Sequence, residues 1–166
     1  MNLVKCFVIL IFVCAHVQAN TLCESEETTF FNCLTNSKKI ISLCGSPDIT
    51  KEKGYLQYRF GKKGKVELTY PENKNPSASK FFYVLYTRPS AFYSNIKFTN
   101  SGIGYEIFIN SDPEMKPVKS SGVTVTTDKK TATIQCKELI TASIQKLEGI
   151  VSCDPVDALN MDGCPK

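Results

Sequence analysis

The chain offers few side chains for catalysis. Its one histidine, His16, lies within the first nineteen residues, and the chain contains no tryptophan. Serine, threonine and cysteine nucleophiles ordinarily need an activating base, and neither a G-x-S-x-G nor an H-E-x-x-H motif is present in the sequence. We therefore expect a protein that is not an enzyme and that uses no cofactor.

Paired carboxylates would suit a glycosidase, which holds two of them on either side of a sugar. Glu67 and Glu106 are such acidic residues, but each alternates with apolar neighbours along its segment. Alternation of this kind places the acidic side chains on the water-facing side of a strand. We expect both to be solvated surface.

Metal ligands are equally sparse. The tail segment 157–163 has spaced oxygen ligands before a glycine, but its first spacing is wrong for an EF-hand and the terminal glutamate is missing. We expect a capped turn there. Zinc sites favour C-x-x-C pairs or histidines, and residues 20–166 contain neither. We therefore expect no metal.

The cysteines have the strongest structural meaning. Six follow residue 19, namely Cys23, Cys33, Cys44, Cys136, Cys153 and Cys164. An even set in an exported domain predicts three disulfides, for which 15 pairings are possible. Cys153 and Cys164 flank a short tail and are expected to pair. The other four would share two bridges, with at least one joining Cys136 to the N-terminal cluster.

The first nineteen residues resemble a secretory signal peptide. Lys5 precedes an apolar run over 6–13, and Val17 and Ala19 occupy the positions that suit cleavage after residue 19. The apolar run is shorter than the roughly 20 residues that span a bilayer. We expect a secreted or periplasmic protein with no membrane span.

The remaining segment, 20–166, is expected to form a single domain. It has 147 residues (166 less 19), and loss of Lys5 leaves 19 basic and 16 acidic residues, a net charge of +3. This excess is too small for a nucleic-acid-binding protein, which concentrates basic residues on one face.

Apolar and polar residues alternate along most of the segment between the cysteines. Clear runs with short polar turns occur over 30–44, 55–70 and 122–136, with further strands over 81–109. About nine strands joined by short turns predict an all-β protein, an antiparallel barrel or sandwich built from hairpins. Segment 138–147 has helical spacing, which predicts a short C-terminal helix, although a strand remains an alternative.

The turn after the strand over 92–98 has the sequence Asn100-Ser101-Gly102-Ile103-Gly104-Tyr105. It is similar to the S-G-x-x-Y loop of the bacterial periplasmic lysozyme inhibitors, which are small, exported, disulfide-bonded β-proteins. The resemblance implies that Ser101 and Gly102 enter the cleft of a lysozyme and that Tyr105 braces the loop. Such a turn is also an ordinary hairpin connection.

These observations favour an exported binding protein with a protein partner, of the inhibitor or immunity type, and a lysozyme is one such partner. The alternative is a β-domain that binds carbohydrate or the cell envelope. A glycan-binding protein of that kind would present exposed aromatic rings beside Lys62 and Lys63, at the lysine-rich turn.

Overall fold

The computed structural model describes residues 20–160 and 164, so the expected signal peptide, 1–19, lies outside the described residues. Ten strands and two short 3₁₀-helices follow one another along the chain. They are β1 (Thr28–Thr35), β2 (Ile40–Gly45), β3 (Leu56–Lys62), β4 (Lys65–Tyr70), η1 (Ala78–Lys80), β5 (Phe82–Arg88), β6 (Ala91–Asn100), β7 (Ile103–Ser111), β8 (Lys119–Thr126), β9 (Thr131–Ala142), η2 (Ile144–Leu147) and β10 (Ser152–Cys153).

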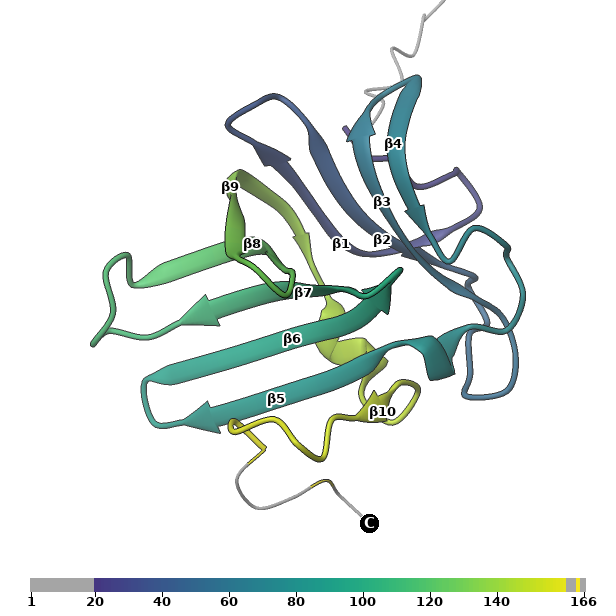
Figure 1. Cartoon of the computed structure of the whole chain (residues 1–166). Helices are drawn as coiled ribbons and strands as arrows, with labels where there is room; N and C mark the ends of the chain where they lie inside the picture. Colours follow the sequence, from purple (N-terminus) through teal and green to yellow (C-terminus); the bar gives the residue numbers. More distant parts are fainter. Residues whose placement is uncertain (1–19, 161–163, 165–166) are drawn as a thin grey trace, which may run out of the picture.

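All ten strands belong to one sheet in the order β10-β5-β6-β7-β8-β9-β1-β2-β3-β4. Every neighbouring pair is antiparallel except β10 with β5. The sheet curls into a half-barrel, with β1–β4 in one half and β5–β8 in the other (Figure 1). This confirms the all-β prediction and identifies the architecture as an open, curled sheet.

The long strand β9 connects the two halves. Its first part pairs with β8, and its last part, up to Ala142, pairs with β1. The register of the β1–β9 pair shifts twice, between Asn32 and Cys33 and between Leu34 and Thr35. Shifts of this kind bend a strand and increase its twist. The bend allows one continuous sheet to serve both halves (Figure 1).

The apolar core fills the inner face of the curl. Tyr58 of β3 lies 5.1 Å, centroid to centroid, from the ring of Phe98 of β6, and Tyr70 of β4 stacks on the same ring at 4.6 Å. Ile144 and Leu147 of η2 are fully buried in this core. The two halves therefore share one core, in which aromatic side chains supply much of the contact area.

Of the two alternatives for 138–147, the C-terminal helix is wrong and the strand forms as far as Ala142. Pairing with β1 keeps the segment extended through Ala142, and only Ile144–Leu147 turns into a 3₁₀-helix. A 3₁₀-helix places residues three apart on the same side, which is why Ile144 and Leu147 match helical spacing. Leu139 and Ile140, the other apolar residues of that pattern, are exposed.

Residues 20–27 cover the outer face of β2 and β3. The guanidinium of buried Arg59 donates two hydrogen bonds to Glu27, at 2.6 and 2.7 Å. The hydroxyl of Tyr55 donates a third to the same carboxylate at 2.7 Å. Because the Glu27 side chain is only 2% exposed, this ion pair is part of the interior, where a charge persists only if it is paired.

Three disulfides join Cys23 to Cys44, Cys33 to Cys136 and Cys153 to Cys164. The pairing of the last two cysteines and the link from Cys136 to the N-terminal cluster confirm the predictions. Three disulfides in one small chain indicate an oxidising, extracytoplasmic compartment. Within the described residues, none of the helices is long and apolar enough to cross a membrane.

Candidate functional site

The tip of the β6–β7 hairpin is a two-residue turn. Asn100 pairs with Ile103 across the ladder, which leaves Ser101 and Gly102 as the two central residues. Their φ angles are +52° and +77°, as a type I′ hairpin turn requires. Both residues are exposed, and a Cβ at Gly102 would meet no atom within 4 Å. The turn therefore projects into solvent with its backbone conformation fixed by the ladder.

Tyr105 lies on the inner face of the same hairpin. Its ring is stacked on Phe98 at 4.8 Å with an interplanar angle of 2°, and Phe98 is in turn stacked on Tyr70. Three rings in a row thus fasten the base of the turn to β4 in the other half of the sheet. The structure places Tyr105 behind the tip, whereas Ser101 and Gly102 form the tip itself.

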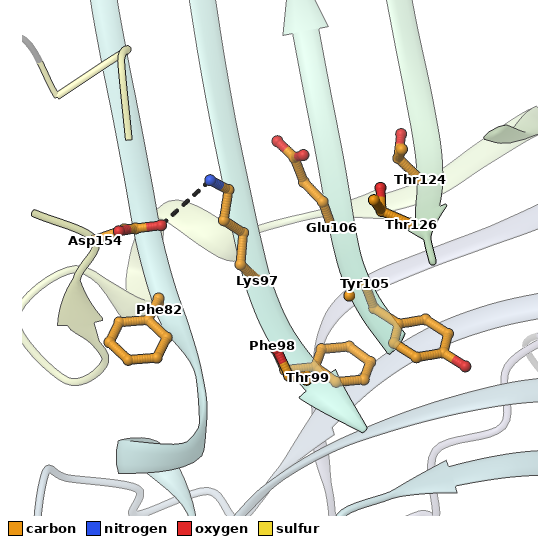
Figure 2. Close-up of a pocket in the computed structure, with 10 residues that line it drawn as sticks. Phe82, Lys97, Phe98, Thr99, Tyr105, Glu106, Thr124, Thr126 and Asp154 are labelled. Carbon is orange, nitrogen blue, oxygen red and sulfur yellow. Dashed lines mark hydrogen bonds and ion pairs between the residues drawn. The ribbon is translucent and has the colours of Figure 1, made fainter. Parts of the chain in front are cut away.

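A hollow of about 290 Å³ lies on the outer face of β5–β8, next to this hairpin. Figure 2 shows its lining. The side chains that define it are Phe82, Lys97, Thr99, Glu106, Thr124, Thr126 and Asp154. Ser101 and Gly102 do not line it, but Thr99 and Gly104 do, so the hollow begins where the hairpin tip ends.

The hollow follows from the strand register. Lys97 pairs with Glu106 across the β6–β7 ladder, and Glu106 pairs with Thr124 across the next ladder, so these side chains form one row. In the next row Gly104 lies between Thr99 and Thr126. Because glycine has no side chain, that row has a gap at its centre. A Cβ at Gly104 would lie 3.7 Å from the backbone oxygen of Thr126, an ordinary van der Waals distance, so there is room for a methyl group at this position.

Charged groups in the hollow are partly paired. The Lys97 ammonium contacts the carboxylates of Asp154, at 3.2 Å, and Asp157. Burial lowers the pKa of Lys97, but these two carboxylates outweigh it and raise the pKa. Asn95 donates a hydrogen bond of 2.5 Å to Oε1 of Glu106. Burial raises the pKa of Glu106, against the opposing effects of Lys97 and Asn95.

The expectation that Glu106 is solvated is therefore wrong: it is half-buried beside Lys97. The polar side of an alternating strand faces water only where nothing covers it, and here the segment after β10 brings Asp154 and Asp157 over that side. Sequence reasoning missed this site. The hairpin turn at Ser101 does predict that Lys97 lies opposite Glu106, but no local pattern places Asp154 there.

Asp157 forms the capped turn that was expected. Its Oδ1 accepts a hydrogen bond of 2.8 Å from the backbone N–H of Leu159, and its carbonyl oxygen accepts one of 3.0 Å from Asn160. Residues 161–163 of the proposed calcium pattern lie outside the described residues. Across the described chain, Cys23, Glu27 and Cys44 form the one group with suitable ligand spacing for a metal. The two cysteines of that group are bridged to each other.

A lysine three residues after a serine could act as the base that activates it, but the pairs at 77–80 and 94–97 are not arranged for this. Ser77 exchanges hydrogen bonds with the backbone of Leu56, at 2.9 and 2.8 Å. Ser94 is fully buried in β6, and alternation along the strand directs Lys97 to the opposite face.

Comparison of the chain with protein families, with curated proteins and with solved structures found no match.

Proposed function

We propose that the chain is an exported, non-enzymatic binding protein that contacts a protein partner through the tip of the β6–β7 hairpin. One observation carries this proposal: the turn at Ser101 and Gly102 is exposed, while Tyr105 just behind it is stacked against the core. A loop fixed in one conformation before binding loses little entropy when it binds. Inhibitor loops have this combination of exposure and rigidity.

The lysine-rich turn supports glycan binding less well. Lys62 and Lys65 close the β3–β4 hairpin, but Phe60, the aromatic residue of that hairpin nearest to the turn in sequence, lies under the Nζ of Lys39 at 5.0 Å from the ring centroid. The large apolar side chain exposed there is Val66, which is 46% exposed. The turn therefore lacks the exposed ring that would stack on a sugar.

Enzymes of the lysozyme class are the first partners to test, because the S-G-x-x-Y pattern at Ser101–Tyr105 resembles that of their periplasmic inhibitors. The purified protein at micromolar concentration is expected to reduce the activity of at least one lysozyme type. Undiminished activity of all types would overturn the inhibitor proposal for lysozymes. Capture of a different extracellular protein, lost on mutation of Ser101, would support the binding function with another partner.

Two variants test the tip without disturbing the fold. Ser101→Gly removes the hydroxymethyl group at a position where φ is +52° and glycine carries no strain. Ser101→Asn creates the Asn-Gly pair that type I′ turns prefer, so stability should be kept while the contact surface changes. Partner binding is expected to weaken in both, and unchanged binding in both would move the site away from the tip.

A further inference from the structure

We propose that the hollow on the outer face of β5–β8 binds a neutral saccharide unit, with one sugar ring over Gly104 and Phe82 at its edge. This site is separate from the hairpin tip, because neither Ser101 nor Gly102 lines the hollow. The proposal does not rest on the protein-binding function.

The hydrogen-bonding groups of the hollow favour a polyhydroxylated ligand. The Lys97 ammonium can only donate, the Glu106 carboxylate can only accept while ionised, and threonine hydroxyls do both. Three threonines, Thr99, Thr124 and Thr126, contribute such hydroxyls. Within the described residues Thr124 and Thr126 make only long hydroxyl contacts, of 3.4 and 3.3 Å, with threonines of β9. A ring of sugar hydroxyls needs donors and acceptors side by side, and the hollow supplies both.

Charges of both signs in the hollow disfavour ionic ligands. Lys97 contributes a positive charge, and Glu106 and Asp154 contribute carboxylates. An anionic sugar or a phosphate would meet the two carboxylates, and a cation would meet the Lys97 ammonium in the same row as Glu106. A neutral ligand avoids both repulsions, since like charges at close range weaken binding.

Phe82 supplies the apolar contact. It is 41% exposed although its strand, β5, has a neighbouring strand on each side, β10 and β6. The flat C–H face of a sugar ring packs well against an aromatic ring, and such rings dominate the energetics of binding sites. Figure 2 shows Phe82 at one edge of the hollow, on the side of Lys97 away from Glu106.

The size of the hollow limits the ligand. Its volume of about 290 Å³ lies at the lower end of the roughly 300 to 1,000 Å³ that small-molecule sites occupy. One or two sugar rings fit this volume, and the open outer side permits a longer glycan to continue past Thr126. The sugar ring would lie over Gly104, between the side chains of Thr99 and Thr126.

The test is a titration of the ¹⁵N-labelled, oxidised protein, followed by its amide chemical shifts. The probes are the methyl glycosides of glucose, galactose, mannose and N-acetylglucosamine, together with cellobiose and chitobiose, at millimolar concentrations. At least one is expected to give saturable shifts at Gly104, Glu106 and Thr124. If no probe gives saturable shifts there, the proposal is wrong.

Variants show whether the hollow is the site that binds the saccharide. Phe82→Ala and Glu106→Gln should each weaken saccharide binding by about tenfold. Gly104→Ala adds one methyl group to the floor with no contact under 3.7 Å, so the fold should persist while affinity falls. Val66→Ala and Glu138→Gln change an exposed apolar residue and an exposed glutamate outside the hollow and should bind as the wild type does. Equal affinity in all five variants would overturn the proposal.

Ionic probes fix the ligand class. Glucuronic acid and lysine amide, used at the same concentrations, are expected to bind more weakly than the best neutral sugar. Tighter binding of either at Gly104 and Glu106 would overturn the neutral class. Ser101→Gly should leave the saccharide shifts unchanged while it weakens a protein partner, so failure of one proposal is distinguishable from failure of the other.

Discussion

The carboxylate of Glu27 accepts hydrogen bonds from three residues, Arg59, Tyr55 and Glu24. Arg59 and Tyr55 donate hydrogen bonds to it from their side chains, and the backbone N–H of Glu24 donates one of 2.7 Å. Burial raises the pKa of Glu27, but these bonds outweigh it and hold the pKa at about 2. The folded protein therefore binds this proton more weakly than the unfolded chain, in which the pKa is close to 4.5.

This difference predicts acid sensitivity. A depressed folded pKa contributes stability that is fully present above the unfolded value and is lost as the pH falls from about 4.5 towards 2, by roughly 3 kcal/mol in all. Urea unfolding measured at several pH values across this window should show the loss. Glu27→Gln should be destabilised near neutral pH by about 3 to 5 kcal/mol, because buried Arg59 loses its partner, and should lose less stability on acidification.

The exposed carboxylate of Glu52 provides the control. Glu52→Gln should unfold as the wild type does at every pH. An acid loss of the same size in Glu27→Gln and in the wild type would contradict the assignment of this sensitivity to Glu27.

At the scale of single residues, the sequence predicts the roles that depend only on residue type and on nearby positions in the chain. The disulfide-forming role of the cysteines and the exposed, glycine-dependent turn at Gly102 follow from residue type and spacing. The pairing of Lys97 with Asp154 does not, because the two residues are 57 positions apart. Only the folded sheet brings the segment after β10 onto the outer face of β6.

Among the elements, the bridge between β1 and β9 constrains the chain most. The Cys33–Cys136 disulfide spans 103 positions, whereas Cys153–Cys164 spans 11. Closing a longer loop removes more entropy from the unfolded chain, by a model that gives about 4.7 kcal/mol for the first loop and about 2.8 kcal/mol for the second.

Paired serine variants should separate the two bridges. Replacement of both Cys33 and Cys136 by serine should destabilise the protein more than replacement of both Cys153 and Cys164. The first bridge also lies between two strands of the core sheet, and its half-cystine Cys33 is fully buried. Denaturant unfolding measures the loss of stability in each variant. Equal losses, or a larger loss in the Cys153 and Cys164 variant, would show that loop length does not determine the stabilisation.

The strands themselves were predictable because alternation is a local property. The expected hairpins over 30–44, 55–70 and 122–136 all form. The end of β9 was not predictable in the same way. Segment 138–147 has both strand and helix patterns, and the choice between them is made by β1, which offers backbone partners to residues up to Ala142.

On the scale of the whole molecule, the order of strands decides the architecture. The strand order follows the sequence from β1 to β4 and from β5 to β9, and these two runs are joined by the pairing of β9 with β1. The first strand thus becomes a central one, with β9 on one side and β2 on the other. Nothing local in the sequence specifies this pairing, which is why the prediction left barrel and sandwich open.

The mature protein should carry no reduced thiol. We expect a chain that begins at Asn20, with a mass six hydrogens below that of the fully reduced 147 residues, because all six cysteines after residue 19 are paired. Intact-mass spectrometry under non-reducing conditions measures both properties. A thiol that reacts in the native protein, or a different first residue, would contradict the prediction.

The central place of the first strand also affects how the protein is made. The ribosome synthesises a chain from its N-terminus, so Cys23, Cys33 and Cys44 are made early and close together. The partner of Cys33, Cys136, is made 103 positions later. In the finished molecule Cys23 is bonded to Cys44, across Cys33. A growing chain that is oxidised early therefore meets wrong partners for Cys33 before the right one. We therefore expect maturation to require exchange between thiols and disulfides, a slow reaction that cells accelerate with isomerases.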